Sequence, residues 1–502
     1  MRGQYYWYPG MENIMKLTEY LEKLEYEIVR GDADREITEV VYDSRKLSKG
    51  CIFVCVEGAN FDGHSAVPQA AEAGAGAVIV SKDVEVPADS DLTVVKVTDT
   101  RYAMAFIAAA DNGYPADKLT TIGITGTKGK TTTTYMVKSI LEKMGRKVGL
   151  IGTIETVIGD KSIPSKNTTP DSFQLQAYFK EMVEAGIDTV VMEVSSQGLM
   201  LHRTQGFTFD LGIFTNIEPD HIGPNEHKDF EDYMHCKGLL FSQCKTGIIN
   251  GDDAHADHVI EGHTCQILKY GFNDNNDYIA KDMRLTRAEG HIGVDFHVAG
   301  KIDMDVDVST PGIFSVYNAL TAIAICDQFG AAEADVRKAL REVKVKGRIE
   351  LVHVSDEFTL MIDYAHNAMA LQSLLGTLKE YNPHRLVSVF GCGGNRDRNR
   401  RFEMGEVSGK LADLTIITSD NPRFEEPLDI MADIVTGIER TEGIYITIAD
   451  RKEAIRYAIT HGEPGDIIVL AGKGHEDYQE IKGVKYPMDE RVLIAEVLEE
   501  LA

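Results

Sequence analysis

A glycine-rich loop between a strand and a helix constrains the fold of this chain most. The stretch GITGTKGKTTT (123–133) joins the strand-like TIGIT to the helical run KTTTTYMVKSILEKM. Glycines let backbone N–H groups face an anion, and the N-terminus of the following helix adds positive potential. Because Ile124 stands five positions before Gly129, the loop is a compact variant of the GxxxxGK[ST] pattern. We therefore predict a triphosphate site, with Lys130 on the terminal phosphates and Thr131 as a possible Mg²⁺ ligand. The residues predicted to bind ATP in this loop are Gly126, Thr127, Lys128, Gly129, Lys130, Thr131 and Thr132.

Apolar runs alternate with helical stretches after this loop. KVGLIG, TVVMEV, DLGIFTN and GIIN predict further strands of a central parallel sheet. TLMID, LVSVF, LTIIT, IYITI and DIIVL predict an open, doubly wound, Rossmann-like sheet in the last third, which would bind ligands at the carboxyl ends of its strands. Before the loop, residues 15–115 mix short helices and strands. We predict an α/β protein with a tail at 1–14 and three domains at 15–115, 116–346 and 347–502.

Length, charge and cysteine content limit the function classes. A chain of 502 residues is too long for one core, which also favours about three domains. The formal charge of −27 disfavours nucleic acid as a main partner. The 7 cysteines are odd in number and form no CxxC, so we expect reduced thiols in a cytoplasmic protein. No apolar run is long enough to span a membrane. The N-terminus has no apolar signal core and reads as a tail, so translation could start at Met11 or Met15.

Two polar residues follow strands that would share a rim with the phosphate loop. Glu193 ends TVVME, and His221 follows DLGIFTN. A carboxylate and an imidazole beside a triphosphate suit Mg²⁺. Lys237, in the helical stretch DFEDYMHCKGLLF, reads by itself as a solvated cation.

Four motifs in order resemble the Mur ligases of bacterial cell-wall synthesis. They are GTKGKTT, NTTP (167–170), MEVSSQGL (192–199) and TNIEPDH (215–221), and the resemblance runs from about residue 15 to the end of the chain. It implies an ATP-dependent amide ligase of peptidoglycan synthesis that forms an acyl phosphate and releases ADP and phosphate. The motifs of the last third resemble the branch that adds the third residue of the stem peptide to UDP-N-acetylmuramoyl-L-alanyl-D-glutamate. The first domain would then bind the UDP-sugar, the central domain ATP, and the last domain the amino acid.

The resemblance also assigns residues. It implies that Glu193, His221, Thr131 and a Lys237 carbamylated with CO₂ bind two Mg²⁺ ions. It also implies that Lys130, Lys237, Glu193 and His221 serve catalysis. Asn318 in VYNALTAIA and Asp363 in DYAH would contact the nucleotide. The matching contacts to the UDP-sugar peptide are Ser44, Thr168, Thr169, Ser195 and Arg203.

Three loops of the last third hold polar residues after predicted strands. FGCGGNRD follows LVSVF, TSDNPR follows LTIIT, and AGKGHEDYQ follows DIIVL. Parallel strands would bring these loops to one rim, where arginines can clamp a carboxylate and acids an ammonium. By the resemblance this rim binds meso-diaminopimelate, whose second carboxylate lysine lacks. The residues assigned to it are Arg396, Asp420, Asn421, Pro422, Arg423, Gly472 and Glu476.

Other functions stay open at this point. The nearest is the same ligase using L-lysine, and a folate-type sister ligase fits the DSR motif (43–45) of the first domain less well. A P-loop ATPase would need neither co-substrate. A catalytically weak binding paralogue is suggested by DYAHNAMAL, where the family usually has Thr-Pro-Asp after the histidine, and by IGPNEH. We expect a monomer that contacts neither nucleic acid nor membrane.

Overall fold

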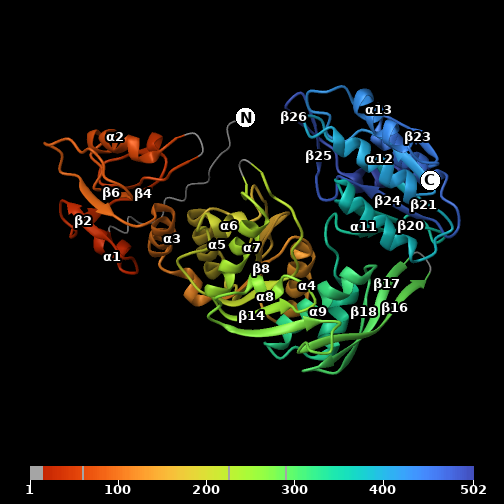
Figure 1. Ribbon diagram of the computed structural model, residues 1–502, viewed down its shortest axis with the longest axis horizontal. Helices are drawn as coiled ribbons and strands as arrows, with labels where there is room; N and C mark the ends of the chain where they lie inside the picture. Colours follow the sequence, from red (N-terminus) through yellow and green to blue (C-terminus); the bar gives the residue numbers. More distant parts are fainter. Residues whose placement is uncertain (1–14, 59–60, 224–225, 289–290, 502) are drawn as a thin grey trace. The chain divides into compact units, whose positions relative to one another are not determined.

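The computed structural model describes residues 15–58, 61–223, 226–288 and 291–501, and the predicted tail at 1–14 lies outside them (Figure 1). The chain divides into two compact units. The first holds the chain up to Thr127 together with Arg146–Gly247 and His255–Ile267. The second holds Lys128–Gly145, Ile248–Ala254 and the chain from Leu268 onward.

The first unit begins with a small sheet covered by helices on both faces. Its strand order is β2-β7-β6-β5-β4, parallel except where β2 pairs with β7. One face packs against Leu17, Tyr20 and Ile107 from α1 and α3, and the other packs against Val67 and Ala70 of α2. The elements are β1 (Met15–Lys16), α1 (Leu17–Leu21), β2 (Glu27–Arg30), β3 (Glu36–Ile37), β4 (Val40–Val41), β5 (Ile52–Val54), α2 (Val67–Glu72), β6 (Ala77–Val80), β7 (Thr93–Lys96) and α3 (Thr100–Asp111).

Four parallel strands of the first unit carry the central site. They lie in the order β9-β12-β8-β13, and the β10–β11 hairpin extends the β9 edge. The strands are almost wholly buried, as expected for parallel strands with both faces covered. The elements are β8 (Thr120–Thr125), β9 (Val148–Ile151), β10 (Glu155–Ile158), β11 (Lys161–Pro164), α5 (Ser172–Glu184), β12 (Thr189–Glu193), α6 (Ser196–Met200), β13 (Phe209–Phe214), α7 (Phe230–Gly238) and α8 (Ala256–Val259).

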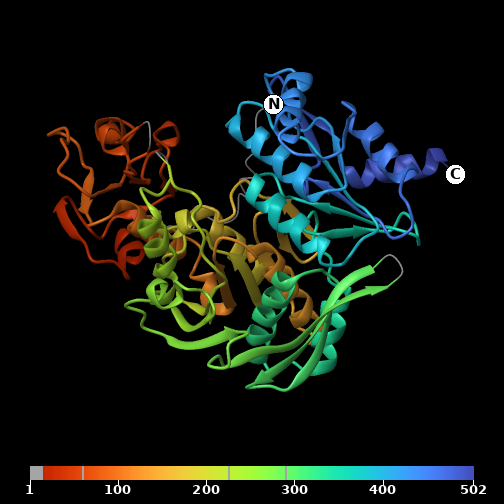
Figure 2. The same ribbon diagram turned by 45° about the vertical axis from the view of Figure 1, so that its right-hand side comes forward.

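The second unit includes a long antiparallel ribbon and three packed helices (Figure 2). Strands β16, β17 and β18 pair antiparallel, and α4 packs against α9 and α10. The sequence did not predict this ribbon. The elements are α4 (Lys130–Lys143), β16 (Tyr278–Ala288), β17 (His291–Gly300), β18 (Met304–Val308), α9 (Ile313–Asp327) and α10 (Glu333–Glu342), while β14 (Cys244–Asn250) and β15 (Gln266–Gly271) contain residues of both units.

The last third of the chain forms a doubly wound sheet within the second unit. Its order is β19-β20-β24-β21-β22-β23, and all pairs are parallel except β19 with β20. Helices α11, α12 and α13 bury one face, and α14 and α15 bury the other. The elements are β19 (Glu350–Val352), β20 (Thr359–Asp363), α11 (Ala368–Lys379), β21 (Leu386–Phe390), α12 (Asn399–Leu411), β22 (Leu414–Ile417), α13 (Pro427–Ile438), β23 (Tyr445–Thr447), α14 (Arg451–Thr460), β24 (Ile467–Ala471), β25 (Tyr478–Ile481), β26 (Val484–Pro487) and α15 (Glu490–Leu501).

The predicted α/β class and the predicted strands of the central and last sheets are confirmed. The β25–β26 hairpin, which follows the AGKGHEDYQ loop, was not predicted. All seven cysteines are free thiols. In the described part of the chain, no helix combines the length and apolar character that a membrane crossing requires.

Candidate active site

The phosphate loop leaves β8 and enters α4 through two glycines in the left-handed region. Gly126 has φ +145°, and a Cβ there would lie 1.9 Å from Thr215 Oγ1. Gly129 has φ +85° and caps α4. Thr127 is fixed by its N–H on the Asn216 carbonyl at 2.9 Å. Only glycine fits either position, so the compact loop holds a shape that ordinary side chains would break.

Asn318 of α9 lies against the beginning of α4. Its Oδ1 accepts a hydrogen bond from Thr133 Oγ1 at 3.4 Å, and a Cβ at Gly129 would lie only 2.4 Å from the same oxygen. The predicted nucleotide residue therefore touches the helix end that would face phosphates. Within this segment Lys128 is exposed, Lys130 and Thr132 are half-buried, and Thr131 is buried.

Glu193 ends β12 as a fully buried carboxylate, 1% exposed. In the sheet it pairs with Ile124 of β8, which places it level with the start of the phosphate loop. Thr153 holds both oxygens: its N–H donates to Oε1 at 2.8 Å and its Oγ1 donates to Oε2 at 2.9 Å. A carboxylate oriented in this way still has lone pairs for a metal ion.

His221 lies beyond β13 in an exposed loop and has φ +54°. Its Nδ1 lies 3.2 Å from Glu226 Oε1, and its backbone N–H donates to Asp220 Oδ1 at 2.9 Å. A non-glycine residue in the left-handed region carries strain, a feature that concentrates at functional sites. Glu193 ends β12 and His221 follows β13, and because both strands run parallel to β8 they end at the rim of the phosphate loop, as predicted.

Lys237 of α7 is a buried lysine rather than a solvated one, with 1% exposure. Its Nζ donates to the Gly126 carbonyl at 3.0 Å and lies 4.3 Å from the centre of the Tyr233 ring. The Tyr233 hydroxyl lies 3.1 Å from Thr127 Oγ1, and burial raises the pKa of this phenol. Lys237 and the phosphate loop are therefore joined directly.

The NTTP motif packs against the turn after β12. Thr169 Oγ1 accepts from the Ser195 N–H at 2.9 Å, and Ser195 Oγ in turn caps α6 by accepting from the Gly198 N–H at 3.0 Å. Arg203 donates to the Thr169 carbonyl at 2.9 Å, and burial lowers the pKa of its guanidinium. Thr168 Oγ1 lies 3.0 Å from Thr153 Oγ1. The structure brings these four residues together beside Glu193.

Ser44 begins a short 3-10 turn, η1 (Ser44–Lys46), in the first unit. Asp43 caps the turn, and the Ser44 carbonyl accepts from Gln69 Nε2 at 3.4 Å. Ser44 is half-buried. Only the family resemblance assigned this residue to the UDP-linked substrate.

In the last sheet, the three predicted loops share one rim. Phe390, Ile417 and Ala471, which end β21, β22 and β24, pair level with one another. The first loop packs so closely on TSDNPR that a Cβ at Gly394 would lie 1.9 Å from the Pro422 carbonyl oxygen. The prediction that one rim gathers these loops is confirmed.

A buried lysine, Lys473, organises this rim. Its Nζ donates to Asn421 Oδ1 at 3.0 Å, to Glu476 Oε2 at 2.9 Å and to the Tyr478 carbonyl. Asn421 also donates from Nδ2 to Glu476 Oε2 at 2.9 Å and accepts from the Glu480 N–H at 2.9 Å. All three ammonium protons are used, so Lys473 fixes Asn421 and Glu476. Asn421 was predicted to contact the ligand, but its side chain forms hydrogen bonds mainly within this network.

Arg423 has φ +52° and an internal counter-ion. Its Nε donates to Glu480 Oε2 at 3.1 Å, and its Nη1 donates to the Gly394 carbonyl at 2.8 Å. The other guanidinium protons can form a bidentate bond to a carboxylate. Glu480 was not predicted, because its place beside Arg423 depends on the β25–β26 hairpin.

The other predicted rim residues differ in environment. Asp420 is buried and accepts from the Asn421 N–H at 2.6 Å, and Gly472, with φ +107°, leaves room for it, since a Cβ there would lie 3.2 Å from Asp420 Oδ2. Arg396 is exposed and, across the described residues, makes no hydrogen bond or ion pair with this group. Asp420, Asn421, Arg423 and Glu476 thus lie together, and Arg396 is an exposed residue of the first of the three loops.

Asp363 ends β20 beside the same rim. It accepts from the Ile349 and Ala365 N–H groups at 2.9 and 2.8 Å, and burial raises the pKa of its carboxyl. The ring of His475, in the loop after β24, lies against the Tyr364 ring in a tilted arrangement, with the centroids 4.8 Å apart. Burial, aided by the Arg348 cation, lowers the pKa of His475 to about 4.

Comparisons with known proteins agree over nearly the whole chain. Three family models match: "Mur ligase family, catalytic domain" at 36–112, "Mur ligase middle domain" at 124–326 and "Mur ligase, glutamate ligase domain" at 347–474. The chain is 44% identical to the UDP-N-acetylmuramoyl-L-alanyl-D-glutamate--2,6-diaminopimelate ligase of Caldanaerobacter subterraneus subsp. tengcongensis, over 97% of this chain and 99% of that one. It is 40% identical to the ligase of the same name from Bacillus velezensis, with the same coverage.

Solved structures show the same relationship. A structure of a UDP-N-acetylmuramoyl-L-alanyl-D-glutamate--2,6-diaminopimelate ligase matches with a TM-score of 0.73 and 29% identity, over 97% of this chain and 99% of that one. The MurF ligase of Thermotoga maritima in complex with ADP matches with a TM-score of 0.58 and 19% identity, over 92% and 98%. The second likeness concerns the fold alone.

Proposed function

The chain belongs to the Mur ligase family, and we propose that it joins diaminopimelate to UDP-N-acetylmuramoyl-L-alanyl-D-glutamate, converting ATP to ADP and phosphate. The observation that carries the choice of amino acid is the rim of the last sheet. There Arg423 offers a guanidinium for a carboxylate, and Glu476 and Asp420 offer acids for an ammonium group. A diaminopimelate molecule has both kinds of group at each end.

The phosphate loop would bind ATP. Backbone N–H groups at 126–129 and the N-terminus of α4 suit the phosphates, and Lys130 would reach the terminal one. The donor set fits Mg²⁺, because Glu193 is a buried carboxylate already oriented by Thr153 and His221 follows the flanking strand. Bound Mg²⁺ would neutralise charge that develops on the transferring phosphoryl group.

The reaction would pass through an acyl phosphate. A D-glutamate carboxylate oxygen of the UDP-linked substrate attacks the γ-phosphorus, and the bond to the ADP oxygen breaks. The amine of diaminopimelate then attacks the carbonyl carbon, loses a proton, and phosphate leaves. Ser44, Thr168, Thr169, Ser195 and Arg203 are the residues we propose for the UDP-linked substrate, and four of them lie together beside Glu193.

We propose that Lys237 carries a carbamate. Carbamylation with CO₂ would convert a buried ammonium into an anion while the remaining N–H still donates to the Gly126 carbonyl. An anionic Lys237 could join Glu193 and His221 as a ligand for a second Mg²⁺ ion. We further propose a cytoplasmic, monomeric enzyme, in keeping with its free thiols.

Release of ADP in the presence of defined co-substrates tests this function. ADP should form only when the UDP-linked dipeptide and diaminopimelate are both present, and the product should have the mass of the tripeptide precursor. Efficient turnover with L-lysine and none with diaminopimelate would favour the runner-up ligase. ATP hydrolysis that needs neither co-substrate would favour a P-loop ATPase, and binding of the UDP-linked substrate without turnover would favour a weak paralogue.

A further inference from the structure

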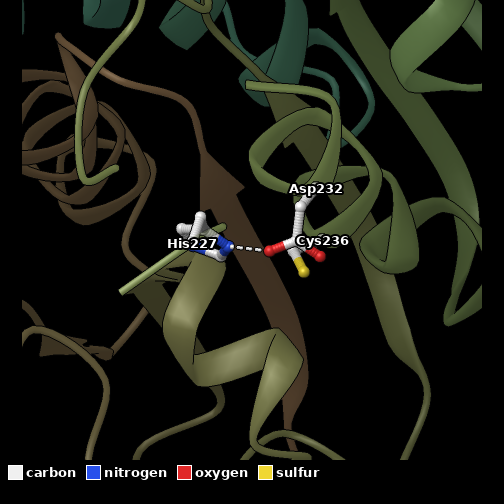
Figure 3. A group of neighbouring side chains, drawn as sticks. All are labelled: His227, Asp232 and Cys236. Atoms are coloured by element: carbon white, nitrogen blue, oxygen red, sulfur yellow. Dashed lines mark hydrogen bonds and ion pairs between the residues drawn. The ribbon is translucent and has the colours of Figure 1, made fainter. Parts of the chain in front are cut away.

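A buried cluster at the start of α7 has no part in the proposed reaction. Asp232 and Cys236 lie one helical turn apart on α7, and His227 precedes the helix (Figure 3). Residues four positions apart project from the same face of a helix. The ligand atoms of the three side chains all lie within 4.8 Å of one another. We propose that His227, Asp232 and Cys236 form a binding site for a thiophilic divalent cation of the Zn²⁺ class.

The chemistry of the donors selects the ion. A thiolate, an imidazole and a carboxylate are the ligands of Zn²⁺ and Co²⁺, whereas Mg²⁺ favours oxygen ligands and water. Bonds of about 2.0–2.3 Å put the ligand atoms of a tetrahedral site roughly 3–4 Å apart. His227 Nδ1 and Asp232 Oδ2 already lie 3.1 Å apart. Cys236 Sγ lies within 4.8 Å of both atoms, so an inward movement of the thiol would complete the ligand set.

The imidazole is oriented before any ion binds. His227 Nε2 lies 2.8 Å from Ser196 Oγ, the first residue of α6. If Nε2–H donates to that hydroxyl, Nδ1 presents its lone pair to the cluster. Metal-bound histidines are normally held by a hydrogen bond from the other ring nitrogen in this way.

The cluster is buried except on the side of Asp232. The side chain of His227 is 1% exposed and that of Asp232 is 25% exposed, while Cys236 is 3% exposed overall. An ion can therefore enter beside Asp232 and keep a water molecule as its fourth ligand, with the other two donors shielded. The bound ion would tie the loop before α7 to the helix that carries Lys237.

A second cluster of potential metal ligands already has a lysine ammonium bound to its carboxylates. Glu57, Asp62 and His64 also lie close together in the first domain. There the Lys82 ammonium bonds both carboxylates and lies 2.8 Å from Asp62 Oδ2. No such ammonium bonds Asp232 or Cys236 among the described residues, so the α7 cluster is the better cation site.

Cobalt titration of the full-length, chelator-treated protein tests the proposal. Co²⁺ should bind with one equivalent showing a thiolate-to-cobalt charge-transfer band and the intense visible bands of a tetrahedral ion, and Zn²⁺ should displace it. Ions bound at the phosphate side would lack the thiolate band. Cys236→Ser should abolish that band, whereas Cys265→Ser, at a half-exposed cysteine of the same unit, should keep it.

Two further variants keep the test decisive if Cys236→Ser folds poorly. His227→Gln should weaken Co²⁺ binding strongly, and Ser196→Ala should weaken it about 10- to 100-fold by releasing the imidazole. Absence of a thiolate band from the folded wild-type protein at saturating Co²⁺ would overturn the proposal. A band of full strength in folded Cys236→Ser or His227→Gln would overturn it equally. Neither result bears on the ligase reaction, which is assayed separately.

Discussion

In the phosphate loop of residues 126–132, backbone geometry fixes the shape, whereas the rim of the last sheet is held by charged side chains. A Cβ at Gly126 would lie 1.9 Å from Thr215 Oγ1, and a Cβ at Gly129 would lie 2.4 Å from Asn318 Oδ1, so a side chain at either position would clash. At the rim, Lys473 bonds Asn421 and Glu476, and Glu480 bonds Arg423. In the proposed reaction, the loop would bind ATP in every turnover, and the rim would distinguish one amino acid from another. Substitutions in the loop should therefore stop the reaction, whereas substitutions at the rim should change which amino acid the enzyme uses.

The largest effect is expected from Lys130→Ala. Loss of the ammonium from the phosphate loop should reduce kcat for ADP release about 100- to 1000-fold, the range seen when one stabilising donor is removed from a transition state. Lys138→Ala is a matched control on the same helix, because within the described part of the chain the only ion pair of Lys138 is with Glu142, one turn away. A Lys130→Ala enzyme with most of its activity would refute the assignment of the loop.

Lys237→Ala comes next, because it removes the link to the Gly126 carbonyl and the proposed carbamate. Activity should fall about 100-fold, and a short carboxylate such as formate should restore part of it. Lys228→Ala, at an exposed lysine just before α7, should behave as wild type. Loss of activity with no rescue would leave Lys237 important but contradict the carbamate, and unchanged activity would contradict both.

Lys473→Met should affect the rim and leave the phosphate loop unchanged. Without the ammonium, Glu476 and Asn421 lose their common donor, and bonds of this kind contribute about 1.5–3 kcal/mol. The KM for diaminopimelate should therefore rise about 10-fold or more, while the KM for ATP and for the UDP-linked substrate changes little.

The control for this variant is Lys485→Met in the adjacent hairpin, where the ammonium lies 3.7 Å over the Tyr478 ring. That change should leave all three KM values near those of wild type. If Lys473→Met raised every KM equally, the lysine would be a general stabilising residue rather than a positioning residue for the amino-acid pocket.

The smallest effect concerns pH. Because burial lowers the pKa of His475 to about 4 from an ordinary value of 6.5, the unfolded chain binds a proton in this interval that the folded chain does not. Stability should therefore fall as pH drops from 6.5 towards 4. At pH 5.5 this effect should lower the free energy of unfolding by on the order of 1 kcal/mol relative to neutral pH. His475→Gln should flatten the pH dependence of thermal unfolding, and His353→Gln, at an exposed histidine, should not.

The two regions also differ in how far the sequence predicts them. Residues 123–133 are contiguous, and glycine positions alone indicate the turn. The strands of the last sheet were predictable from buried apolar runs such as LTIIT, and their parallel pairing brings three loops together. Lys473 lies in the AGKGHEDYQ loop, but the sequence gives no indication that this lysine binds three partners.

Longer-range features were less predictable. Strands β16 and β17 mix charged and apolar residues, so their pattern gave little signal, and Glu480 reaches Arg423 only through the β25–β26 hairpin. The burial of Lys237 was likewise hidden, because a lone lysine in a helix usually faces water. Such features depend on tertiary contacts rather than on local pattern.

Discrimination between diaminopimelate and lysine tests the central claim most directly. The ratio of kcat/KM for the two amino acids should be measured with the wild-type enzyme and with Arg423→Ala, at fixed ATP and UDP-linked substrate. We predict a wild-type ratio strongly in favour of diaminopimelate that collapses by roughly 100-fold or more in the variant, since a site built for a charged partner rejects a ligand that lacks it. A wild-type enzyme that prefers lysine, or an Arg423→Ala enzyme with an unchanged ratio, would contradict the account.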